Sequence, residues 1–122
     1  PLQVGFDATA FENVTEGDAL YMRTSDGQVG KATAADGTSE AATVVGFANA
    51  NTSFGNIVKV IVVGLKTMSS LDAGDLYFLS PSTAGAITLT PPSSAGQAVV
   101  RLGEAATTTT LAIQIEPPIK LS

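Results

Sequence analysis

The chain has 122 residues, of which 44% are apolar and only 14% are charged. This composition predicts one folded domain and excludes a disordered segment, while two independent domains would each be too small to bury a secure core. The net charge of −5 comes from 6 basic and 11 acidic residues, without the basic cluster that a nucleic-acid surface needs. Since Cys and His are absent, disulfides, thiolate chemistry, imidazole metal ligands and the most common general base are excluded.

Charged residues are scarcer than the about 25% found in ordinary soluble domains. We therefore expect part of the surface to face protein, as in a homo-oligomer. The longest apolar run, Val60 to Val63, is far shorter than the roughly 20 residues that span a bilayer. Neither a membrane nor a nucleic acid is expected as a partner.

Residues 1–16 form an N-terminal arm that shows no sustained periodicity. Two interpretations of this arm are open. In the first, Leu2, Val4 and Phe6 alternate as an edge strand of the domain's own sheet. In the second, the arm extends onto a neighbouring subunit.

A sequence repeat organises the remaining residues, 17–122. Gly17-Asp18-Ala19-Leu20-Tyr21-Met22 is followed by Gly74-Asp75-Leu76-Tyr77-Phe78-Leu79 at an offset of 57 (74 minus 17). Val45-Gly46-Phe47-Ala48 and Leu102-Gly103-Glu104-Ala105 share that offset (103 minus 46). Two separated matches at one offset indicate an internal duplication, over 17–64 and 74–118, within a single β domain.

Strand-forming residues and turn signals divide each copy into four strands. The expected strands are 19–24, 28–33, 42–48 and 58–63 in the first copy, and 76–80, 86–90, 99–105 and 111–116 in the second. The predicted fold is therefore all-β, a small barrel or sandwich built from two tandem copies of a four-stranded unit.

The last strand of each copy indicates which face is buried. Leu111–Glu116 alternates apolar and polar residues, which is typical of a half-buried strand. Matching it to Val58–Val63, at an offset of 53 (111 minus 58), places Lys59, Ile61 and Val63 on the outer face. That partly apolar face needs a cover, either from the arm or hairpin of the same chain or from a second subunit, for which these three residues would be the subunit interface.

No motif in the sequence predicts catalysis. The Gly17-Asp18 and Gly74-Asp75 pairs lack the alternating oxygen ligands of a calcium loop, so we expect each Asp to form a turn at the start of a strand. Gly46 and Gly103 lie within strands and predict a β-bulge or a close backbone approach. We therefore expect no enzyme activity, no cofactor and no metal.

The order of these motifs resembles that of small virion structural proteins of tailed bacteriophages, most closely the head decoration or capsid cement proteins. The resemblance covers most of residues 15–118. It is carried by Gly17-Asp18, Leu20-Tyr21, Val44-Val45-Gly46-Phe47-Ala48, Gly74-Asp75-Leu76-Tyr77-Phe78-Leu79-Ser80, Thr83-Ala84-Gly85-Ala86-Ile87-Thr88 and Ala98-Val99-Val100-Arg101-Leu102-Gly103.

This resemblance implies a non-enzymatic structural protein that is made in the host cytoplasm and binds the outer surface of the phage capsid. The expected partners are the major capsid protein and further copies of the chain, with a homotrimer favoured. Phe6 and Phe11 would contact the capsid or a neighbouring subunit. The alternative is a phage tail, collar or head-spike module that recognises host surface glycan.

Overall fold

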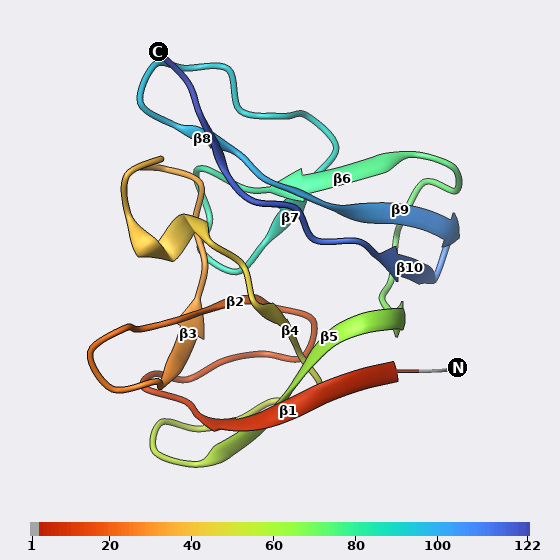
Figure 1. The fold of residues 1–122 in the computed structure, drawn as a ribbon. Coiled ribbons are helices and arrows are strands. Elements are labelled where there is room, and N and C mark those ends of the chain that lie inside the picture. Colours follow the sequence, from red (N-terminus) through yellow and green to blue (C-terminus); the bar gives the residue numbers. More distant parts are fainter. Residues whose placement is uncertain (1–2) are drawn as a thin grey trace.

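The computed structural model describes residues 3–122 (Figure 1). Apart from one short 3-10 turn, η1 (Glu40–Ala42), the regular elements of these residues are strands, which confirms the all-β prediction. The strands of the first half are β1 (Gln3–Thr9), β2 (Ala19–Met22), β3 (Val29–Lys31), β4 (Gly46–Ala48) and β5 (Ile57–Thr67). Those of the second half are β6 (Leu76–Leu79), β7 (Ile87–Thr88), β8 (Ala98–Val99), β9 (Arg101–Thr107), β10 (Thr110–Ile113) and β11 (Ile119–Lys120).

The strand order reveals the internal duplication directly. The main sheet runs β3-β2-β4-β5-β10-β9-β6-β7, with antiparallel pairing throughout. Read from its two ends, this order matches β3 with β7, β2 with β6, β4 with β9 and β5 with β10. The two four-stranded units therefore meet where the equivalent strands β5 and β10 pair, with the first unit below the second in Figure 1. This arrangement confirms the predicted tandem units.

The repeated Gly-Asp pair forms the same turn in both units. Gly17 has a φ of +89° and donates its N–H to the Ala48 carbonyl at 2.9 Å. Gly74 has a φ of +87° and donates its N–H to the Ala105 carbonyl at 2.7 Å. Because left-handed backbone favours glycine, the repeat preserves a turn that ties the first strand of each unit to its third strand.

The larger of two apolar cores lies between the units. The first unit contributes Phe47 and Ile61 to it, and the second unit contributes Leu79, Leu102 and Leu111. Since neither unit buries these side chains alone, the two units share a core, as their small size predicts.

The smaller core lies inside the first unit. Val58 and Val60 of β5 form part of it, with Phe6 of β1 packed against them. Past the end of β1, Ala10 forms a parallel bridge with Val29 of β3. The N-terminal arm thus encloses the smaller core and links both edges of the first unit.

The arm pairs with its own chain. All seven residues of β1 are in antiparallel register with β5, from Gln3 opposite Gly64 to Thr9 opposite Ile57. For Val4 and Phe6 this arrangement corresponds to the first of the two interpretations, an edge strand of the domain's own sheet, while Leu2 lies outside the described residues.

The larger core covers Ile61, which was predicted to face outward, and a β-bulge separates it from Val63. Val4 pairs with Val63 while the next residue, Gly5, pairs with Ile61, so that Val62 is an extra residue in β5. Such a bulge shifts the inside-outside alternation by one residue. Ile61 comes before the bulge and lies on the side of β5 opposite to Val58 and Val60, as predicted, but there it packs against the second unit in the larger core and is 0% exposed. The prediction that Ile61 is exposed to a partner was therefore wrong, and the bulge places Val63 on the other side of the sheet.

The predicted match between the last strands also needs correction. Ala48 pairs with Val60 in the first unit, and Ala105 pairs with Leu111 in the second. The equivalent strands are therefore offset by 51 (111 minus 60) rather than 53. Relative to the offset of 57 for the preceding strand, the second connection is six residues shorter (57 minus 51), not four.

Candidate partner-binding surface

The two phenylalanines predicted to contact a partner are engaged with their own chain. Phe6 is half-buried against the smaller core. Phe11 packs over Gly30, where a Cβ atom would collide with its ring, and stands edge-on to Tyr21 with 5.7 Å between ring centroids. The guanidinium of Arg23 covers the Phe11 ring at 3.9 Å from its centroid.

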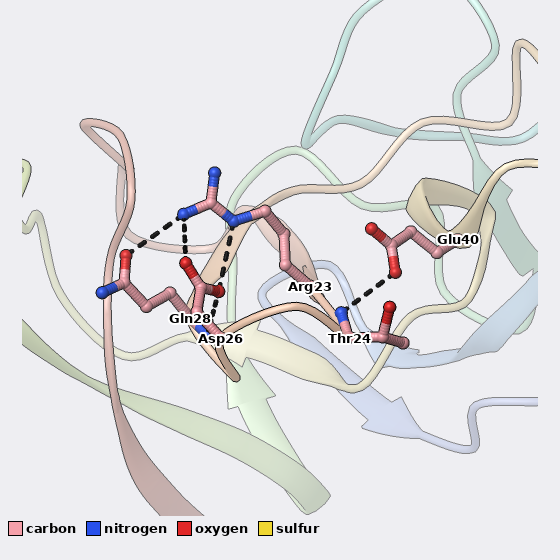
Figure 2. Close-up of polar contacts among 5 residues, drawn as sticks. All are labelled: Arg23, Thr24, Asp26, Gln28 and Glu40. Atoms are coloured by element: carbon pink, nitrogen blue, oxygen red, sulfur yellow. Dashed lines mark hydrogen bonds and ion pairs between the residues drawn. The ribbon is translucent and has the colours of Figure 1, made fainter.

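Arg23 is itself fixed by the turn between β2 and β3, as Figure 2 shows. It donates to the Asp26 carboxylate, with an ion-pair distance of 2.6 Å, and to Gln28 Oε1 at 3.3 Å. The backbone N–H of Gln28 and the Arg23 side chain lower the pKa of Asp26. Next in the chain, the Thr24 N–H donates to Glu40 Oε1 at 3.0 Å. The ring beneath Arg23 is thus held in place, and its role as a partner contact stays a prediction.

Of the three predicted interface residues, two are exposed. Lys59 lies at the surface opposite Asp7 of β1. Val63 is 47% exposed and lies opposite Val4, which is also exposed. Ile61, buried in the larger core, has no surface to offer a partner.

Val63 belongs to an apolar surface that crosses three strands. Leu65 lies on the same side of β5, two residues further along, and is opposite Ala112 of β10. We call Val4, Val63, Leu65 and Ala112 the outer patch. It lies on the side of the sheet opposite to Leu111, which points into the larger core. Because it extends from the arm into the second unit, sequence periodicity alone identified only one of its members.

A shallow hollow continues the outer patch. It has a volume of about 480 Å³ and includes Ala112 in its lining. The other residues that line it are Glu104, Ala106, Ile113 and Gln114. Two alanines leave room between larger neighbours, so this part of the surface could receive an apolar side chain.

A second cleft, of about 560 Å³, lies between the two units and is mainly polar. It is lined by Glu16, Gly17, Asp18, Thr67, Met68, Ser69, Ser70, Leu71, Gly85, Ala86 and Ile87.

The charged groups at this cleft bond to their own chain. The buried Lys66 Nζ donates to Glu16 Oε2 at 3.2 Å and to the Thr67 carbonyl at 3.0 Å. Asp18 Oδ2 accepts the Thr15 N–H at 2.8 Å, as predicted for a turn former, and burial raises the pKa of Asp18. These bonds support a structural role. The burial of Lys66 carried no sequence signal.

Sequence reasoning also missed a second apolar surface. Phe54 lies on the connection between β4 and β5, and Ile57, three residues later, is the first residue of β5. They are 70% and 69% exposed, the highest fractions among the large apolar side chains of residues 3–122. The signal that could have identified them is a Phe within a run of Asn, Ser and Gly, where no core packing requires it.

Residues 3–122 form no cluster of three or more acidic, His or Cys side chains that could hold a metal ion. In the same part of the chain, no helix is long and apolar enough to cross a membrane. No protein-family model matches the sequence, and a search of curated proteins found no significant match. The candidate functional features are therefore the two apolar surfaces.

Proposed function

We propose that the chain is a structural virion protein, a cement or decoration protein that binds and stabilises a bacteriophage capsid shell. The motif resemblance suggests this class, and the outer patch is the observation that carries it. Val4, Val63 and Leu65 are exposed together on a sheet that already has two buried cores. Exposed apolar side chains that the fold itself does not need usually mark contacts between proteins.

In this proposal, the outer patch joins copies of the chain into a homotrimer. The patch contains no charged side chain, and Glu104 lies beside it, across from Ala112. A charge placed at Val63 should then prevent assembly. We expect Val63→Asp to be monomeric by light scattering coupled to size exclusion, while Leu89→Asp, at an exposed apolar position of the second unit, keeps the wild-type mass.

The proposed stabilisation of the shell needs no chemistry. A protein that binds only the assembled shell lowers its free energy by mass action, by about 2.7 kcal/mol per site when its free concentration is 100 times its dissociation constant. A ligand that bridges neighbouring capsid subunits therefore makes the shell harder to disrupt.

The proposal is tested with heads of the encoding phage that have been assembled without this chain. Adding the purified protein should saturate the heads at a fixed copy number in cosedimentation and raise the temperature at which they break. Electron microscopy of the complex should place the protein on the outer surface of the shell. Density confined to the tail, or no binding to heads, would overturn the proposal.

A further inference from the structure

The duplication provides an internal comparison for the segment that carries Phe54 and Ile57, the loop after β4 and the start of β5. Beyond the equivalent pairs Ala48–Val60 and Ala105–Leu111, the first unit has the 11 residues 49–59 (59 minus 48), and the second has the 5 residues 106–110 (110 minus 105). Five residues are thus enough to connect these two strands. The additional residues of the first unit are therefore not needed to connect its two strands.

Part of the additional length supports the N-terminal arm. Thr52 pairs with Val14, and Val58 is buried in the smaller core. Neither function requires the two exposed side chains, since Phe54 and Ile57 point away from that core into solvent. An Asn or Ser at either position would leave the support of the arm intact.

Backbone bonds to the arm hold the loop in one conformation. The Phe54 N–H donates to Asn13 Oδ1 at 2.8 Å, and the Gly55 N–H donates to the Ala10 carbonyl at 2.9 Å. The Ala10 N–H donates in turn to the Asn56 carbonyl at 2.9 Å. Because the loop is already ordered, little conformational entropy is lost when the tip binds a partner.

The surroundings of the tip indicate the chemistry of its partner. Residues 49–58 contain no charged side chain, and two neighbouring amides, Asn13 and Asn51, already accept backbone bonds within the chain. A glycan would stack on the Phe54 ring and bond to polar side chains around it, which leaves the equally exposed Ile57 without a role. An anionic membrane would need several basic residues near the tip, where the nearest is Lys59, opposite Asp7 of β1, and the chain has a net charge of −5. An apolar pocket in a protein fits both exposed side chains.

We propose that Phe54 and Ile57 form a knob that inserts into an apolar pocket of a protein partner. This inference rests on the proposed function for the identity of that partner, the major capsid protein. Aromatic side chains that fill a pocket are typical hot spots of protein interfaces. The knob lies on a different part of the first unit from the outer patch, so one surface can bind the shell while the other joins copies of the chain.

The test compares Phe54→Ser and Ile57→Ser with Ile119→Ser. Ile119, at 64% exposed, is a matched control in the second half of the chain. Each variant is titrated onto the heads assembled without the chain, and its urea unfolding midpoint confirms that it is folded. We expect Phe54→Ser to bind at least about 30-fold more weakly, Ile57→Ser to be weaker in the same direction, and Ile119→Ser to match the wild type.

The outcomes separate the two proposals. If the wild-type protein does not bind heads, the proposed function fails. If it binds, and both knob variants bind as tightly as Ile119→Ser, the capsid function stands and the knob is wrong. Binding to phosphatidylcholine–phosphatidylglycerol vesicles or to host polysaccharide that Phe54→Ser abolishes would likewise overturn a protein pocket as the partner of the knob.

Discussion

Replacing Ile61 by Ala tests the β-bulge that distinguishes the structure from simple alternation. Ile61 is 0% exposed in the core shared by the two units, whereas Val63, two residues away, is 47% exposed. Regular alternation would place both side chains on the same outer face. The bulge at Val62 places them on opposite faces.

The expected cost follows from the burial of the Ile61 side chain. Ile61→Ala removes three buried carbon groups, at about 0.8 kcal/mol each, and leaves a cavity that raises the total to about 3 kcal/mol. With a urea m-value of about 1.5 kcal/mol/M, the unfolding midpoint should fall by about 2 M. The melting temperature should fall by roughly 10 °C. Val63→Ala should change the free energy of unfolding by less than about 0.5 kcal/mol.

Urea denaturation followed by circular dichroism at several protein concentrations provides the measurement. The concentration series is necessary because Val63 lies in the proposed contact between copies, where a mutation can change the apparent stability by mass action. Equal losses for the two variants at low concentration, or a larger loss for Val63→Ala, would refute the assignment of Ile61 to the core.

Three further predictions concern single sites. Gly103→Ala should destabilise by more than about 1 kcal/mol in urea unfolding, because Gly103 has a φ of +154° and an added Cβ would collide with the Ala112 carbonyl. Glu16→Gln should lower the stability of the wild-type protein, because it leaves the buried Lys66 ammonium without its carboxylate partner. The same substitution should have little effect in a Lys66→Met variant, which has no ammonium there, and equal losses in the two proteins would argue against this pairing. Burial raises the pKa of Asp18 above its ordinary value of 3.8, so the folded chain binds this proton at a higher pH than the unfolded chain does. The contribution of Asp18 to stability therefore falls as the pH rises from the pKa of the unfolded chain to that of the folded chain. Asp18→Asn removes this loss, so its stability relative to the wild type, measured by urea titration, should be greater at pH 7 than at pH 3.5.

The sequence predicts most of the fold because the duplication makes the same prediction twice. The Gly17 and Gly74 turns, the shared core and the inward positions of Leu111 and Ile113 all follow from local patterns that the structure confirms. In these places, backbone conformation and alternating burial agree with the residue types.

Other features depend on strands that are distant in sequence. The bulge at Val62 arises where β1 pairs with β5, and no residue within Val60–Val63 indicates it. The burial of Lys66 depends on Glu16, 50 residues away. Likewise, β11 pairs with β8 beyond 111–116, the last of the expected strands. Single-strand periodicity does not contain such tertiary pairings.

The exposed apolar residues were predictable only in part. Val63 was identified because its strand could be compared with a second copy, although Ile61 beside it was misplaced. Phe54 and Ile57 lie in a connection that is six residues longer than its counterpart in the second unit, so comparing the two copies did not identify them.

The direction of β1 determines how the domain would respond to force. Gln3 lies opposite Gly64, near the end of β5 that leads into the rest of the chain. Tension between the N-terminal side of β1 and the second unit therefore loads the β1–β5 ladder from one end, and its bonds break one after another rather than together. The arm would peel away first and uncover Val58 and Val60, while the core between the units keeps its strand pairs. Under mechanical load, the first unit would extend before the junction of β5 and β10 gives way.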